Sequence, residues 1–451
     1  MKKILIILSI LLLMFLALPL FDNNAVIKEL STRLVMLEKH GLEVKEDKNN
    51  STYFTTRMKY KVKVTDSQKF LKYLQQYSSS QLPAYMDSLL GGSSIGVDVE
   101  FSPIFFFSGV GVDIYPLTFS NTDIELHTFV NNMIKKQAIL YHINYNILNS
   151  DFDGYIKDID EKYTNKNNTK VSLKLQGSSF SGSGLLIAPD SLNSKIKELD
   201  LQILQKDTKV RLKLKDLLLT SNFQSASTYI YTTNMKYVDF FVEDVRKDKL
   251  KLKATNTYIN IASNTQGKKA ELTTRSSFDK ILIAKNKDEI SLDYLNYDLS
   301  ATKIDKDAAE KLRVLLMKLK VTPSAKLKAD INDTFIEILS KGINIFLGDL
   351  SVSKINYKNN KNIDGFSISI DFDLAPNAGF INNMKTNPQA IISDLTLKSS
   401  FIFSKEFYPV LSKIIPIAAP MKGFAKDTGD DLEFIIKLED NKILVNNKLL
   451  R

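Results

Sequence analysis

One stretch of the chain carries oxygen ligands at the spacing of a calcium-binding loop. Positions 1, 3, 5, 6, 8 and 12 of that twelve-residue pattern are occupied by Asn149, Asp151, Asp153, Gly154, Ile156 and Asp160. Carboxylate oxygens suit Ca²⁺, and the glycine permits the sharp turn of the loop. A strand-like pattern ends just before it, at Ile147, so an acidic hairpin turn is the alternative. Calcium on Asn149, Asp151, Asp153 and Asp160 is the one cofactor that the sequence suggests.

Residues that would support catalysis are sparse. His127 and His142 fall on the polar phase of alternating runs, which predicts two solvent-facing strand residues. The glycine-rich tract 177–184 lacks the Gly-Lys-Ser/Thr ending of a phosphate loop, and it is more typical of a strand with glycines at a bend. The chain has no cysteine, which excludes disulfides and thiol nucleophiles. The sequence therefore predicts a protein that is not an enzyme.

The N-terminal stretch sets the compartment. Lys2 and Lys3 precede an uncharged run, Ile4 to Phe21. As a helix this run reaches about 27 Å, close to the ~30 Å hydrocarbon core of a bilayer. Its end lacks the Ala-x-Ala arrangement of a cleavage site, which favours an uncleaved signal-anchor over a cleaved signal peptide. With the two lysines held inside, the rest of the chain lies on the far side of the membrane.

The net charge is +10 at pH 7, from 61 Lys and Arg against 51 Asp and Glu. This balance suits anionic headgroups or acidic polymers. The lysines, however, are spread singly along alternating runs, which indicates solvated outer faces of strands. No basic block with interleaved aromatic residues occurs, so nucleic acid is not expected as a partner.

The body of the chain reads mainly as strands with one apolar face. Alternation is clearest at 58–64, 97–101, 141–147, 199–203, 210–214, 250–252, 290–299 and 366–374. Asp153-Gly154 and Asp364-Gly365 are expected at turns between such runs. Helical spacing appears at 67–90, at 307–320, where Asp307 and Glu310 resemble a capping pair, at 331–346, and at 405–424, which prolines interrupt.

These patterns predict a mostly β (α+β) fold, with long twisted antiparallel sheets and a few covering helices behind an N-terminal membrane helix. The expected organisation is a membrane anchor at 1–21, a stalk helix at 22–41, a β-rich ectodomain at 42–305, a helical lid segment at 306–348, and a C-terminal segment completing the sheet at 349–451. The last segment closes with strands at 432–438 and 443–445.

The most apolar tract of the body runs from Ile104 to Phe119. Its candidate groove residues are Phe105, Phe106, Phe107, Val110 and Val112. The three phenylalanines are apolar on both phases of a strand, a pattern most simply explained by ordinary core residues. The alternative is that they line an open groove for lipid or another apolar partner.

Several motifs resemble the YdgA-like family of bacterial envelope proteins. They are the short N-terminal anchor with its stalk helix, the strand entry Tyr53-Phe54-Thr55-Thr56, the strand that runs into a helix at 396–407, and the closing pair Phe434 to Leu438 and Ile443 to Lys448. The resemblance implies a single-pass protein of the bacterial inner membrane with its body in the periplasm. It implies no settled activity.

Anchor, sheet and apolar tract together predict a non-enzymatic, membrane-anchored envelope protein that binds lipid or another apolar partner along a sheet groove. The alternative is a structural or assembly factor of the envelope that acts through contacts with other envelope proteins.

Overall fold

The computed structural model describes residues 36–52, 55–77, 91–101, 109–118, 141–146, 148–164, 169–185, 188–206, 208–225, 228–244, 246, 248–321, 324–357, 360–380, 382–383, 392–415, 418–439 and 441–450. The chain forms two compact units, Met1–Lys197 and Glu198–Arg451. The predicted segment 42–305 therefore contributes to both units, and the segments 306–348 and 349–451 belong to the second.

The first unit is built from antiparallel strands and one helix. The strands are β1 (Leu42–Ser51), β2 (Thr56–Val64), β3 (Ser94–Phe101), β4 (Val110–Thr118), β5 (Tyr141–Tyr145), β6 (Asp151–Ile156), β7 (Ile159–Thr164), β8 (Lys170–Leu185) and the start of β9 (Ala188–Gln205). Strands β1 to β6 pair in chain order, and β8 pairs with both β6 and β7. Helix α2 (Ser67–Tyr77) follows β2.

Strand β2 shows why these segments are strands. Its residues alternate strictly between buried and exposed, with Met58, Tyr60 and Val62 inside and lysines between them outside. Met58 and Tyr60 form a core cluster with Val99 and Phe101 of β3. The period of two in the sequence thus places one apolar face of the sheet inside, as predicted.

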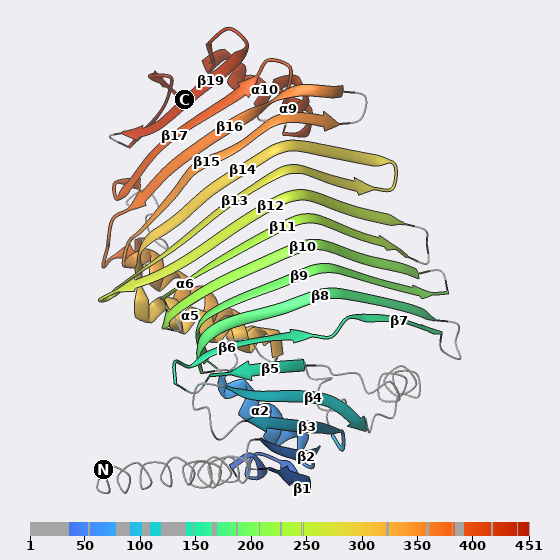
Figure 1. Cartoon of the computed structure of the whole chain (residues 1–451). Helices are drawn as coiled ribbons and strands as arrows, with labels where there is room; N and C mark the ends of the chain where they lie inside the picture. The colour runs from blue at the N-terminus through green and yellow to red at the C-terminus, as the bar shows by residue number, and fades with distance from the viewer. Residues whose placement is uncertain are drawn as a thin grey trace, which may run out of the picture. The chain divides into compact units, whose positions relative to one another are not determined.

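The second unit holds the long strands. They are the end of β9, β10 (Thr208–Ser225), β11 (Thr228–Glu243), β12 (Lys249–Gln266), β13 (Lys269–Lys285), β14 (Asp288–Asp305), β15 (Ile343–Tyr357), β16 (Asn360–Leu374), β17 (Leu395–Ser404), β18 (Lys426–Asp427), β19 (Asp431–Glu439), β20 (Lys442–Val445) and β21 (Lys448–Leu449). From β10 to β17 each strand pairs antiparallel with the next, and β17 pairs with β19 (Figure 1). The mostly β, antiparallel prediction is confirmed.

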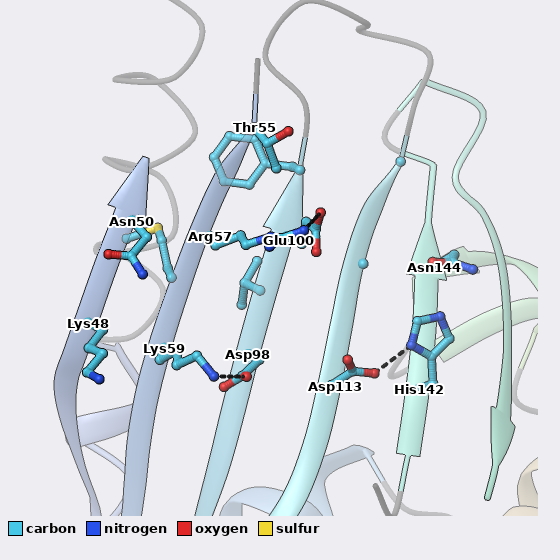
Figure 2. Close-up of a pocket in the computed structure, with 15 residues that line it drawn as sticks. Lys48, Asn50, Thr55, Arg57, Lys59, Asp98, Glu100, Asp113, His142 and Asn144 are labelled. Carbon is cyan, nitrogen blue, oxygen red and sulfur yellow. Dashed lines mark hydrogen bonds and ion pairs between the residues drawn. The ribbon is translucent and has the colours of Figure 1, made fainter. Parts of the chain in front are cut away.

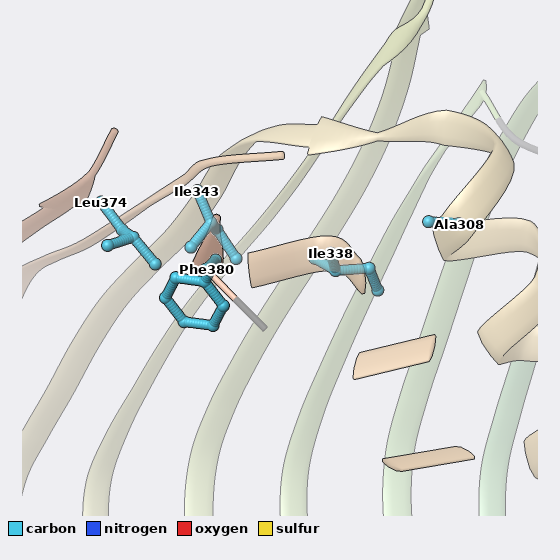
Figure 3. Close-up of a cluster of buried hydrophobic side chains, with 5 residues drawn as sticks. All are labelled: Ala308, Ile338, Ile343, Leu374 and Phe380. Carbon is cyan, nitrogen blue, oxygen red and sulfur yellow. The ribbon is translucent and has the colours of Figure 1, made fainter. Parts of the chain in front are cut away.

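Helices cover parts of this sheet. Helices α5 (Lys306–Val321) and α6 (Ala325–Ser340) bring Ala308 and Ile338 into a buried cluster with Ile343, Leu374 and Phe380 (Figure 3). Helix α9 (Tyr408–Ile414), with α10 (Ala418–Met421) and a short 3₁₀ turn (Lys422–Phe424), packs beside two further clusters at the other ends of the strands. The proline-interrupted stretch 405–424 is therefore helical in short pieces, as its prolines predict.

The predicted boundaries of the two lid helices were wrong in detail. The second helix ends at Ser340 rather than Phe346, because Gly342 adopts a φ of +81° and Ile343 starts a strand. The cap of α5 is Asp305, whose Oδ1 accepts a hydrogen bond from the backbone N–H of Ala308 at 3.0 Å. Glu310 instead binds Arg313.

The two Asp-Gly pairs do not form turns. Asp153-Gly154 lies inside β6 and Asp364-Gly365 inside β16. A Cβ on Gly154 would collide with the carbonyl oxygen of His142, and one on Gly365 would collide with that of Val352. Glycine is required here for close approach of neighbouring strands, which a pair of residue types alone does not distinguish from a turn.

The predicted anchor, 1–21, lies outside the described residues, and so does most of the stalk. The described end of the stalk is helical over 36–38 and closes at Gly41, which adopts a φ of +87° as expected after a helix. Within the residues that the structure describes, no helix is long and apolar enough to cross a bilayer.

Candidate functional site: an uncovered apolar face

Strands β10 to β14 turn apolar side chains to one face of the sheet. Residues directly opposite each other on paired strands share a face. Partners on successive strands therefore form rows, each with one residue from every strand from β10 to β14. Three such rows on this face are Leu212, Phe240, Leu252, Ile283 and Ile290; Leu214, Val238, Ala254, Ile281 and Leu292; and Leu219, Thr233, Ile259, Ser276 and Tyr297. We call the surface that these strands form the apolar face.

All five strands bend at one line, visible in Figure 1. The line is Asp216, Lys236, Asn256, Asp279 and Tyr294, the residues at which the regular pairing from β10 to β14 is interrupted. Asp216, Asn256 and Tyr294 have φ values of 49°, 46° and 55°. Such left-handed residues interrupt the alternation of a strand, so two consecutive residues there turn away from the apolar face.

The sequence compensates for the bend. In β12 the apolar positions are Leu250, Leu252 and Ala254 before the bend, and Thr257, Ile259 and Ile261 after it. The period shifts by one residue at Thr255-Asn256, so the apolar side chains stay on one face along the whole strand. In β16, without left-handed residues between Phe366 and Leu374, the same face alternates without a shift.

The buried clusters beneath the helices lie on the later strands, although helix α5 also contacts β13. The three buried hydrophobic clusters described in this unit draw their strand residues from β14 onward. On β12, β13 and β14, five large apolar side chains of this face remain between 37% and 43% exposed: Leu250, Leu252, Leu272, Ile283 and Leu299. Large apolar side chains left exposed together on one face of a sheet make that face a candidate binding site.

The opposite face of the same strands is charged and internally paired. Lys253 lies opposite Asp239, with Nζ 3.6 Å from its carboxylate, and Arg275 lies opposite Asp298 at 2.9 Å. Lys280 and Asp293 form a third such pair at 3.5 Å. This face also exposes Leu218, Ile230 and Tyr258, but it carries these cross-strand ion pairs, whereas the exposed side chains named on the apolar face are all Leu or Ile.

The predicted groove residues lie elsewhere. Val110 and Val112 are partly buried and pack against the Met58, Tyr60 and Phe101 cluster of the first unit. Their packing favours the interpretation of core residues at these two positions. Phe105, Phe106 and Phe107 lie outside the described residues.

The twelve-residue calcium loop is not formed, because Asp151–Ile156 is a strand. Asp153 lies opposite Ser181 of β8 and Asp160 lies opposite Lys174 of the same strand. Seven residues of strand separate these two partners by about 20 Å, too far for one ion. Asn149 accepts a hydrogen bond from the backbone of Asp151 in a local turn. In the described part of the chain, no three His, Asp or Glu side chains converge on a metal-sized site. Calcium binding by Asn149, Asp151 and Asp153 stays a prediction.

His142 is less exposed than its alternating pattern predicts. Its Nδ1 lies 2.6 Å from Oδ1 of Asp113, directly opposite on β4, and its ring stacks on Tyr155. His142 and Asp113 line a polar hollow of about 580 Å³ together with Lys48, Arg57 and other residues of β1 to β5 (Figure 2). A carboxylate beside Nδ1 holds the imidazole ring in one orientation. His127 lies outside the described residues.

The apolar face was missed because its residues are scattered over five separate strands. One sequence signal could have revealed this face. In both β12 and β14 the alternation of apolar and polar residues shifts by one residue near the middle of the strand. The chain matches no protein-family model, no curated protein and no solved structure.

Proposed function

We propose that the chain is a non-enzymatic protein of the bacterial inner membrane, anchored by residues 1–21 with its body in the periplasm, that binds lipid acyl chains along the apolar face of β10 to β14. The observation that carries the proposal is the contrast within one sheet. Helices bury the apolar face over β14 to β17, whereas Leu252, Ile283 and their neighbours stay exposed.

Lipid is the occupant best supported by the chain. The uncharged run Ile4 to Phe21 would hold the protein at a bilayer, where acyl chains are the most abundant apolar ligand. Full burial of a Leu or Ile side chain contributes roughly 1.5–3 kcal/mol, so covering the five exposed residues contributes several kcal/mol. The residues between the exposed ones include the small, buried Ala254, Thr257 and Ser276.

Photocrosslinking tests the proposal on the full chain in its own membrane. A photoreactive amino acid at Leu252 should form adducts with phospholipid, identified by mass spectrometry. The matched control is the same probe at Lys251, the adjacent residue, which points to the charged face. Lipid adducts at position 252 and none at position 251 support the proposal.

The other outcomes are equally informative. Adducts of Leu252 to a second protein would replace lipid binding by the assembly role that works through protein contacts. Equal lipid adducts at positions 251 and 252, or none at either, would overturn the proposal.

A further inference from the structure

The first two strands present six cations on one face. They are Lys45 and Lys48 of β1, and Arg57, Lys59, Lys61 and Lys63 of β2; we call this surface the basic face. The intervening residues of β2 are buried on the other side of the sheet. The basic face therefore points away from the core of the first unit, and its side chains are exposed.

The register places like charges directly against each other. Lys45 lies opposite Lys61, and Lys48 lies opposite Lys59. Like charges in this position destabilise a strand pair. On the charged face of the second unit, by contrast, Lys253, Arg275 and Lys280 each lie opposite an aspartate. The stability of the sheet does not explain lysine opposite lysine, but an anionic partner does.

Carboxylates neutralise only half of the basic face. Glu43 pairs with Lys45 at 2.7 Å, Asp98 with Lys59 at 2.7 Å and Glu100 with Arg57 at 3.0 Å; the last two are seen in Figure 2. Asp47 also lies on β1. Among the described residues, Lys48, Lys61 and Lys63 form no ion pair within 4.0 Å, although Glu43 lies directly opposite Lys63 and interacts electrostatically with Lys61 and Lys63. Lys61 faces Gly96 on β3, which has no side chain to offer.

We propose that the basic face docks on the surface of an anionic phospholipid bilayer, an inference that rests on the membrane anchoring proposed above. Residues 22–41 separate the apolar run from β1, and a chain of that length extends at most about 70 Å. The strand pair is thus tethered near headgroups. Basic clusters close to a membrane segment attract anionic lipid within a Debye length, and the bound phosphates relieve the repulsion between the facing lysines.

Because the chain has no cysteine, a single introduced cysteine can be labelled specifically to test docking directly. The full chain carries one fluorescent label at Thr65→Cys, an exposed residue just after β2, in nanodiscs whose headgroups bear a quencher. With phosphatidylglycerol in the disc, the ratio of docked to undocked label should rise about tenfold over phosphatidylcholine alone. The rise should disappear as NaCl approaches about 0.5 M. Equal quenching in both lipids would overturn docking.

Two sets of substitutions separate a specific face from total charge. A triple variant of the basic face should abolish the rise in docked label that phosphatidylglycerol causes; it combines Lys48→Gln, Lys61→Gln and Lys63→Gln. Lys236→Gln, Lys285→Gln and Lys287→Gln remove the same charge from exposed positions of the second unit and should leave it intact. A triple variant of the basic face that still docks would overturn the proposal.

Membrane anchoring and docking of the basic face can be tested separately. A chain that does not remain in the disc contradicts the anchor, and flotation with phosphatidylglycerol vesicles then tests the face alone. Wild type that floats while the basic-face variant does not supports the inference. Binding to heparin without flotation would overturn it in favour of an acidic polymer.

Discussion

Asn256 of β12 donates a hydrogen bond from its side-chain Nδ2 to Oδ2 of Asp279 on the neighbouring strand β13, at 2.6 Å. The two residues lie at the centre of the line where five strands bend. Asn tolerates the left-handed backbone better than most residues, and its side chain here ties two bent strands together. The bend keeps the long apolar face continuous, so the pair supports the proposed binding surface without being part of it.

Substitution of Asn256 should show the backbone cost of the bend. Its φ of 46° is unfavourable for a β-branched residue, so Asn256→Val should lower the free energy of unfolding by about 1–2 kcal/mol. Asn256→Gly, which accepts this φ freely, should change it by no more than about 0.5 kcal/mol. Urea denaturation of both variants measures the difference; equal losses would show that the hydrogen bond, rather than the backbone, dominates.

Thr257 offers a stabilising substitution. Its hydroxyl is buried on the apolar face with no hydrogen-bond partner among the described residues, and the residue is only 3% exposed. Removing a buried polar group without a partner is neutral or favourable, so Thr257→Val should raise the free energy of unfolding by up to about 1 kcal/mol. Thermal unfolding followed by circular dichroism measures it. A loss of more than about 1 kcal/mol would reveal a partner for the hydroxyl.

Asn446 and Asn447 form the tight turn between the last two strands and should respond in opposite ways. The side chain of Asn446 donates to the carbonyl oxygens of Phe424 and Glu433 and accepts from the N–H of Ile435. Asn446→Ala should therefore cost about 2–3 kcal/mol. Asn447→Gly relieves a φ of 62° and should be neutral or stabilising by up to about 1 kcal/mol. Urea midpoints of the full chain measure both, and an Asn446→Ala variant as stable as wild type would contradict the bonding scheme.

Tyr115 should make stability depend on alkaline pH. Burial and the hydrogen bond from its hydroxyl to Asp98 raise the pKa of Tyr115 to about 12, above its usual value near 10. A raised pKa stabilises the folded state fully below pH 10, and this contribution is lost as the pH rises from about 10 to about 12. Urea midpoints should fall more steeply over this range for wild type than for Tyr115→Phe. Parallel curves would rule out a contribution from this phenol.

Much of the secondary structure followed from the sequence alone. The lysine-spaced run Met58 to Val64 gave β2 and its buried face, and the leucine spacing of 307–320 gave α5. Both elements rest on local periodicity, since a side chain's face is set by the repeat of its own strand or helix. The prolines of 405–424 likewise marked where the helix had to break.

Contacts between distant segments were decided by tertiary structure. Gly154 and Gly365 were expected in turns, but neighbouring strands approach them so closely that no other residue fits. Val110 and Val112 were candidates for a groove, but they pack, partly buried, against the Met58 cluster. Lys45 and Lys61 are sixteen positions apart, and only the register of β1 on β2 sets one lysine against the other. A one-dimensional pattern fixes which way a side chain points, whereas the residue it meets depends on strand register and on which helices cover the sheet.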